Sequence, residues 1–155
     1  FEPDPTNHAQ LQANLFLNGA ENDIEVLQLA ASDRETSFGL VVRTALNRGA
    51  TRVAREGETA HVTCRADRVD RRLDFEGKLL VVKMDVEGHE LEALEGMTGL
   101  LAKNRCVLQV EIWDDPDGEL QRREKILEGF FARYGMTCVG AMVNDHWYVP
   151  AGGKA

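Results

Sequence analysis

The chain has 155 residues, of which 43% are hydrophobic and 28% are charged, and these proportions are typical of one soluble globular domain spanning residues 1–155. Its formal net charge of −8 makes nucleic acid an unsuitable partner, because acidic surfaces repel the phosphate backbone. The chain contains no run of about 18 apolar residues, so we predict no membrane-spanning segment and no membrane partner.

The three cysteines, Cys64, Cys106 and Cys138, lie far apart in the sequence. No two of them form a CxxC pair, and this argues against a disulfide framework or a zinc knuckle. We therefore predict a protein of the reducing cytoplasm.

The first elements are expected to be a strand end, a helix and a second strand. Residues 1–2 resemble the last part of a strand, and Asp4 is suited to cap a following helix. That helix should end at Asn18 and Gly19, because glycine adopts the left-handed conformation that closes helices. Residues 24–30 (IEVLQLA) then alternate enough in hydrophobicity to predict a strand.

Residues 34–78 interrupt this alternation of helices and strands. Three short segments rich in valine and threonine (TSFGLVV, TRVA and HVTCR) are separated by the turn sequences RGA and EGET. This pattern predicts a small antiparallel β-rich insertion. Because much of the insertion is polar, we expect it to lie over a site rather than in the core.

The second half predicts alternating strands and helices. Residues 79–85 (LLVVKMD) are apolar in an unbroken run, which is typical of a central parallel strand. The turn at 143–145 joins the last two strands into an antiparallel hairpin, a feature that favours a methyltransferase over a dehydrogenase. We expect an α/β fold with a mostly parallel sheet and helices on both of its faces. Strands are expected at 79–85, 106–112, 136–142 and 146–149, and helices at 90–101 and 120–134.

Acidic residues stand where the early strands end. Glu2, in the motif FEPDP, follows a strand end, and a carboxylate there can accept two hydrogen bonds from a ribose diol. The alternative is a solvated acid favoured by the dipole of the next helix. Ser32 and Asp33, in AASD, would lie beside the same crevice, where Asp33 could accept an adenine amino group. The alternative there is an ordinary polar turn.

The segment 83–90 (KMDVEGHE) is the most specific motif, because a strand leads directly into three acids and a histidine. Asp85, Glu87 and His89 should lie at the mouth of the sheet, where such folds bind ligands. The residue types suit a metal site, but their spacing matches neither an HExxH pair nor an EF-hand loop, and we predict no metal. His89 could act as a general base. A helix-capping acidic cluster is the third interpretation.

Glu111 closes the apolar strand in VLQVEIW. A carboxylate at that point is costly unless it is paired or faces a crevice, although the strand end could also simply emerge into water. Trp113 follows and could flank a substrate.

The ordered motifs FEPDP, AASD, KMDVEGHELEALEG and VEIW resemble those of FkbM-type methyltransferases, over essentially the whole chain. The resemblance implies a Rossmann-like fold that binds S-adenosylmethionine and methylates a hydroxyl of a small-molecule acceptor, a sugar or a secondary metabolite. It implies that Glu2, with Pro3 beside it, holds the ribose. Ser32 and Asp33 would lie near the adenine, and Asp85 near the methionine portion.

Family members carry a strand and a glycine-rich loop, D-x-G-A-N-x-G, before the FEP motif, and the printed sequence lacks them. The resemblance places that strand between the strands ending at Glu2 and Asp85. Its absence would leave unpaired strand edges and remove the glycines that let the backbone approach the cofactor. We therefore expect residues 1–155 alone to bind the cofactor weakly.

The candidates for the catalytic base are His89, Asp85 and Glu111, and the candidates for substrate contacts are Glu87 and Trp113. Two alternatives stay open: an inactive binding module derived from a methyltransferase, and an NAD-dependent oxidoreductase of Rossmann type. A homo-oligomer is compatible with the sequence.

Overall fold

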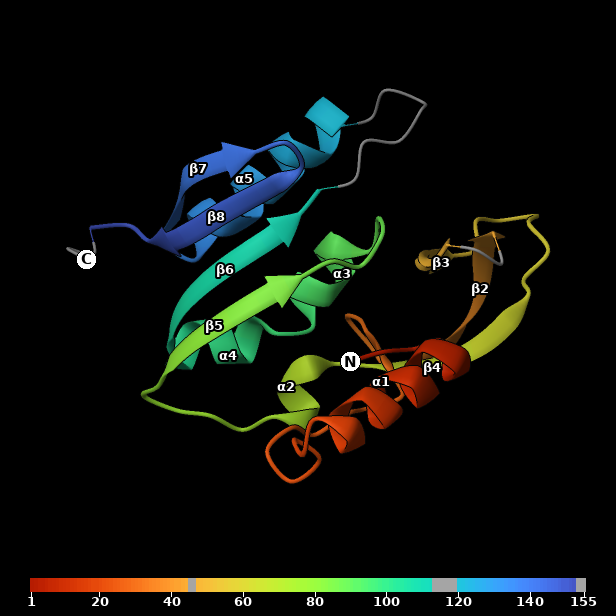
Figure 1. Ribbon diagram of the computed structural model, residues 1–155. Helices are drawn as coiled ribbons and strands as arrows, with labels where there is room; N and C mark the ends of the chain where they lie inside the picture. The colour runs from red at the N-terminus through yellow and green to blue at the C-terminus, as the bar shows by residue number, and fades with distance from the viewer. Residues whose placement is uncertain (45–46, 113–119, 153–155) are drawn as a thin grey trace.

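The computed structural model describes residues 1–44, 47–112 and 120–152 (Figure 1). Within these residues it contains two four-stranded sheets, with strand orders β1-β4-β2-β3 and β5-β6-β8-β7. The elements in chain order are α1 (Pro5–Leu17), β1 (Ala30–Ala31), β2 (Thr36–Thr44), β3 (Asn47–Val53), β4 (Val62–Asp67), α2 (Val69–Arg72), β5 (Leu79–Met84), α3 (Glu90–Glu95), α4 (Thr98–Lys103), β6 (Arg105–Glu111), α5 (Leu120–Arg133), β7 (Met136–Met142) and β8 (Asp145–Pro150).

Helix α1 has the boundaries that its sequence predicts. The Asp4 side chain accepts hydrogen bonds from the backbone amides of Thr6 at 2.7 Å and Asn7 at 3.0 Å, as an N-cap should. The helix ends at Asn18, and Gly19 follows with a φ of 64°. No side chain of α1 is fully buried, so its capping matters more than its packing.

The predicted strand at 24–30 is reduced to Ala30–Ala31, and residues 1–2 are not in a strand. One backbone hydrogen bond of 3.0 Å, from Glu2 to the carbonyl of Leu27, joins these two segments. A strand requires a ladder of hydrogen bonds to a partner, so alternating hydrophobicity alone did not create one here.

The β-rich segment is antiparallel, as predicted. Strand β2 pairs antiparallel with both β3 and β4, while β1 pairs parallel with β4. The apolar core of this sheet is small. It consists of Ala30, Leu40, Cys64 and Ala66.

The second sheet corrects the prediction of one mostly parallel sheet. Strands β5 and β6 are parallel, but β8 is antiparallel to β6 and to β7, so this sheet contains one parallel pair and two antiparallel pairs. The predicted terminal hairpin is present, with its turn at Val143 and Asn144. Both sheets are mixed because the β-rich segment and the hairpin each contribute antiparallel pairs.

The predicted helix at 90–101 is broken into α3 and α4. The break lies at Gly96, whose carbonyl accepts the backbone amide of Asp70 at 3.0 Å. A Cβ atom at Gly96 would collide with the carbonyl oxygen of Ser32, so only glycine fits this contact between the helices and the turn after β1.

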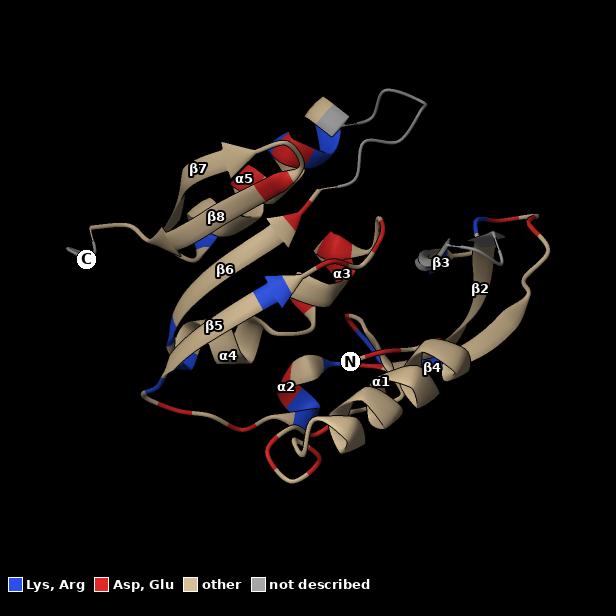
Figure 2. Ribbon diagram, in the orientation of Figure 1, with Lys and Arg blue, Asp and Glu red and all other residues tan. Residues whose placement is uncertain are grey.

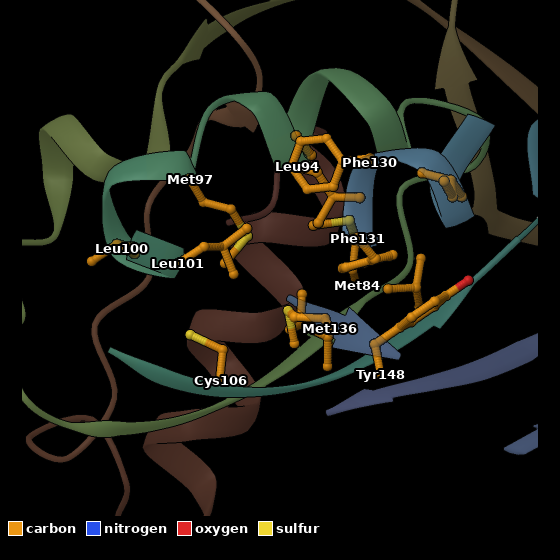
Figure 3. Packing of buried hydrophobic residues seen from close by; sticks show 14 of the residues in the cluster. Met84, Leu94, Met97, Leu100, Leu101, Cys106, Phe130, Phe131, Met136 and Tyr148 are labelled. Carbon is orange, nitrogen blue, oxygen red and sulfur yellow. The ribbon is translucent and has the colours of Figure 1, made fainter. Parts of the chain in front are cut away.

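Helices α3, α4 and α5 pack on one face of the second sheet, and Figure 3 shows the buried side chains between them. On the opposite face, Leu79 and Val81 of β5 are 63% and 78% exposed. The expectation of helices on both faces is therefore wrong for this part of β5. The buried cluster includes Met84, Leu94, Met97, Leu100, Leu101, Cys106, Leu108, Val110, Ile112, Leu127, Phe130, Phe131, Met136 and Tyr148.

None of the helices in the described ranges is both long and apolar enough to traverse a bilayer. The three cysteine thiols are free, and Cys64 and Cys106 are buried while Cys138 is exposed.

Candidate functional site

A cavity of about 110 Å³ lies where the N-terminal segment, β1, β3 and the loop after β5 meet. Segments far apart in the sequence therefore contribute to one wall. The cavity brings together five of the residues that the sequence nominated: Glu2, Pro3, Asp85, Glu87 and His89.

A larger cavity of about 390 Å³ follows the edge of β5 that has no strand partner among the described residues. The two cavities share four lining residues, Phe1, Ala31, Asp85 and Val86, so they meet beside the end of β5. The larger one lies between β5 and the N-terminal segment, where the family resemblance predicts a further strand.

Glu2 is half-buried at the wall of the smaller cavity. Its Oε1 atom accepts the backbone amide of Asp4 at 2.8 Å, which fixes the carboxylate at the start of α1. Burial raises the pKa of Glu2, and the hydrogen bond from Asp4 opposes that shift. Asn7, also on the wall, hydrogen-bonds to the same carboxylate.

The loop after β5 is held in an unusual backbone conformation. Glu87 and Gly88 have φ angles of 50° and 96°, and the Gly88 amide donates to Oε1 of Glu90 at 2.7 Å. Glu90 is itself buried, with Nη1 of Arg123 3.7 Å from its other oxygen. A Cβ at position 88 would lie 2.8 Å from that Nη1 atom. The φ of Gly88 therefore favours glycine, whereas the Arg123 guanidinium is the end of a flexible side chain that could shift.

His89 is fixed by contacts on several sides. Its Nε2 atom lies 3.1 Å from Oγ of Ser32, and its ring contacts the Phe38 ring edge-to-face at 5.0 Å. Its Nδ1 atom lies 3.7 Å from Glu92. Burial lowers the pKa of His89, although the charges of Glu92 and Asp33 oppose the shift, so the imidazole is neutral near pH 7.

Ser32 and Asp33 do not line the smaller cavity, although the sequence placed both in the cofactor site. Ser32 is fully buried, and its hydroxyl joins His89 to Oδ1 of Asp33, 3.2 Å away. The Asp33 carboxylate forms an ion pair of 2.7 Å with Arg34. The Ser32 hydroxyl therefore holds the His89 ring through this contact. A contact of Ser32 or Asp33 with adenine stays a prediction.

Sequence reasoning missed Arg68, which ties the turn after β1 to α2. Its Nη1 atom donates to the carbonyl of Asp33 at 2.9 Å, and its Nε and Nη2 atoms form a bidentate pair with Asp70. Burial alone would raise the pKa of Asp70, but hydrogen bonds from Arg68 and from the Gly99 amide bring it below the ordinary value.

Glu111 lies close to Asp85, as neighbouring strand ends should. Burial raises the pKa of Glu111, and the negative charges of Asp85 and Asp145 raise it further. The Lys83 side chain is 61% exposed, and its Nζ atom lies 3.8 Å from Oδ2 of Asp85. Figure 2 shows the acidic residues gathered where β5 and β6 end.

Glu111 is not on the wall of the smaller cavity, and Trp113 lies outside the described residues. Across the part of the chain that the structure describes, no three His, Cys, Asp or Glu side chains are placed to hold a metal ion.

The fold is α/β, and Glu2, Asp85 and the partly buried His89 line one hollow. The profile described as "Methyltransferase FkbM domain" matches residues 1–136, so the chain belongs to this methyltransferase family. The resemblance seen in the sequence is thereby confirmed.

Among solved structures, methyltransferase FkbM from Methylobacillus flagellatus KT has a similar fold, with a TM-score of 0.58 and 18% sequence identity. The match covers 96% of this chain but 35% of that chain, so residues 1–155 span about a third of the length of the solved protein. At this identity the likeness supports the fold alone. A comparison with curated proteins finds no match.

Proposed function

We propose that this domain binds S-adenosylmethionine and transfers its methyl group to a hydroxyl of a sugar or secondary metabolite. The observation that carries the proposal is the meeting of Glu2, Asp85 and His89 on one cavity wall, in a chain of the FkbM methyltransferase family. Glu2 comes from the N-terminal segment and the other two residues from the loop after β5, so their proximity to Glu2 depends on the fold.

The side chains on the wall fit the chemistry of this cofactor. Glu2 provides a fixed carboxylate for the ribose hydroxyls, with Pro3 beside it, and Asp85 provides a second carboxylate for the amino group of the methionine portion. Ser32 and Asp33 supply the adjacent turn for the adenine. The cavity of about 110 Å³ meets the larger one of about 390 Å³ beside the end of β5, which extends the space open to a ligand.

When bound, the cofactor supplies an electrophilic methyl carbon on a sulfonium. The protein must position the acceptor hydroxyl in line with that carbon and remove its proton. Glu2, Pro3 and Asp85 would hold this cofactor, which would give up its methyl group and retain the electron pair of the carbon–sulfur bond. The hydroxyl proton passes to His89, which burial keeps neutral and Ser32 holds in orientation.

Asp85 and Glu111 are the alternative bases. The pKa of Glu111 is raised, as expected of a proton acceptor beside another carboxylate. Glu111 does not line the cavity, however, and His89 does, so His89 is better placed than Glu111 to take the proton. Glu87 lies on the wall, where it can contact the acceptor, and Trp113 remains a predicted substrate contact outside the described residues.

Calorimetry on the intact protein tests the cofactor site. Replacing Glu2 with alanine should weaken S-adenosylmethionine binding roughly 10- to 100-fold, the usual effect of losing hydrogen bonds to a charged group. Glu25→Ala, at an exposed position off the cavity wall, is the matched control and should not change the affinity.

A tritiated-methyl transfer assay against a panel of sugars and polyols tests the reaction. No saturable binding of the cofactor, or equal affinity in Glu2→Ala and the unmodified protein, would contradict the proposed site. Binding without transfer would indicate an inactive module, and saturable binding of NAD instead would indicate the oxidoreductase.

A further inference from the structure

The two ring nitrogens of His89 have different neighbours. The Nε2 atom lies 3.1 Å from Oγ of Ser32, which is fully buried, whereas Nδ1 lies 3.7 Å from Oε2 of Glu92, whose side chain is 46% exposed. A neutral imidazole carries a hydrogen on one nitrogen, and the other, bare nitrogen is the one that can take up a proton. The position of that hydrogen therefore decides how His89 can act as a base.

The Ser32 hydroxyl lies between His89 and Asp33. It donates a hydrogen bond of 3.2 Å to Oδ1 of Asp33, and the other oxygen of that carboxylate forms the ion pair of 2.7 Å with Arg34. An ionised carboxylate has no hydrogen to donate, so the hydroxyl must be the donor in its contact with Asp33. The single hydrogen of the Ser32 hydroxyl is thereby used.

The direction of this hydrogen bond determines the contact between Ser32 and His89. With its hydrogen directed at Asp33, the Oγ atom presents lone pairs to the ring. The distance of 3.1 Å is then a hydrogen bond only if Nε2 carries the hydrogen and donates it. In the neutral ring this arrangement leaves Nδ1 bare, on the side of the partly exposed Glu92.

The opposite arrangement is less favourable. If Nδ1 carried the hydrogen, the Ser32 hydroxyl would have to turn away from Asp33 to donate to Nε2. Nδ1 would then face Glu92 at 3.7 Å, which is too long for a hydrogen bond. One hydrogen bond would replace two, and the attraction to a carboxylate that is half exposed to water is too weak to compensate for the loss.

We infer that Ser32 and Asp33 are positioning residues that hold neutral His89 as the Nε2–H tautomer, so that Nδ1 is the nitrogen that takes up the proton. The role of that proton rests on the proposed methyltransferase function. As the O–H bond of the acceptor breaks, its electron pair forms the bond to the methyl carbon and its proton forms the Nδ1–H bond. The resulting imidazolium still donates to Ser32, and its positive charge faces Glu92.

NMR of the intact protein, labelled with ¹⁵N in its histidine rings, tests the tautomer directly, because protonated and bare ring nitrogens have different chemical shifts. Comparison with His89→Gln identifies the His89 signals among those of the four histidines. At pH 7.5 we expect a protonated Nε2 and a bare Nδ1. A bare Nε2, or two protonated nitrogens, would overturn the inference.

Two variants remove the positioning contacts. Ser32→Ala deletes the acceptor of the Nε2–H, and Asp33→Ala frees the Ser32 hydroxyl to donate to Nε2. Each should move the ring toward the Nδ1–H tautomer and lower kcat at saturating cofactor roughly 10-fold or more, because the bare nitrogen then faces the buried side. Ser37→Ala, at an exposed position off the cavity wall, is the matched control and should change neither the tautomer nor kcat.

The two variants differ in their expected effect on folding, and Tm is measured for each. Asp33 has a partly exposed side chain, so Asp33→Ala provides the test even if Ser32→Ala, at a fully buried position, does not fold. A folded Asp33→Ala with the tautomer of the unmodified protein would overturn the inference, even if its kcat falls.

Glu92→Gln tests Nδ1 as the proton acceptor. It removes the negative charge facing Nδ1 but leaves Ser32, Asp33 and Arg34 in place, so the tautomer should not change. The acidic limb of the pH–rate profile should move to lower pH, because the Glu92 charge raises the pKa of His89. A limb that does not move would contradict proton uptake at Nδ1. Absence of methyl transfer by an unmodified protein that shows the Nε2–H tautomer would refute the proposed function and not the tautomer.

Discussion

The two sheets of this protein have the same number of described strands but very different support. The second sheet packs against a continuous buried cluster that includes Leu108 and Phe130. The first sheet has only four buried apolar residues, of which Leu40 is the largest. At the end of β4, buried Asp67 also forms an ion pair of 2.6 Å with Arg72 of α2. The second sheet is therefore the more extensively packed of the two.

This difference matters for the candidate site because its parts come from both sides. The loop that carries Asp85 and His89 follows β5, which packs against the helices on one face only, while Arg52 lies in the thinly packed sheet. A packed scaffold suits residues that must hold reacting atoms in place.

The largest expected effect is on the packed side. Replacing Phe130 with alanine should lower the free energy of unfolding by about 4 kcal/mol, because it empties a fully buried position between α5 and the sheet. Leu40→Ala in the first sheet should cost only about 2 kcal/mol, since fewer buried neighbours surround it. Urea denaturation measures both values, and an equal loss in the two variants would contradict the comparison.

The next effect concerns the reaction. His89→Ala should lower kcat roughly 100-fold if the imidazole removes the acceptor proton, and the acidic limb of the pH–rate profile should disappear with it. That limb should lie below pH 6.5 in the unmodified enzyme, because burial lowers the pKa of His89. An unchanged pH–rate profile in the variant would shift the role to Asp85 or Glu111.

The contact between the two regions gives a smaller effect. Gly96→Ala should lower the free energy of unfolding by about 1–3 kcal/mol, because the added methyl collides with the Ser32 carbonyl. Gly129→Ala, inside α5 with open space around it, is the matched control and should raise it by about 0.5–1 kcal/mol. Thermal unfolding of both variants measures these changes. An unchanged free energy of unfolding in Gly96→Ala would show that the turn and the helices move independently.

Helix α1 tests the thinly packed side. Asp4→Ala should lower the free energy of unfolding by about 1 kcal/mol through loss of the N-cap, while Asp4→Asn should preserve most of it because the amide oxygen still accepts the two hydrogen bonds. Circular dichroism during denaturation measures the difference. If both variants lose the same free energy of unfolding, the negative charge of Asp4, and not its N-cap hydrogen bonds, stabilises the protein.

The smallest effect is a pH dependence of stability. The pKa of His89 is lower in the folded protein than its unfolded value near 6.5, so protonation favours unfolding. Its contribution to stability is present above pH 6.5 and is lost as the pH falls toward the folded pKa. Unfolding measured from pH 7.5 to 5 should therefore show a steeper loss for the unmodified protein than for His89→Gln, and parallel curves would contradict a buried neutral imidazole.

Local sequence determined much of this protein. Asp4 and Gly19 set the ends of α1 through capping chemistry, and the turn at 143–145 specified the hairpin. The apolar run 79–85 specified a strand, but β5 is an edge strand with Leu79 and Val81 exposed, not the central strand that the run predicted. The ordered motifs also identified the family, because they carry the residue types that its chemistry needs at fixed places along the chain.

Tertiary structure decided what depends on contacts between distant residues. Residues 24–30 became a strand only at Ala30–Ala31, because a strand needs a partner that hydrophobic alternation does not reveal. Ser32 was placed beneath His89, 57 positions away in the chain, rather than on the cavity wall, and Arg52 was placed on that wall with one donor unpaired. These arrangements arise from contacts between segments far apart in the chain, and no short-range pattern encodes them.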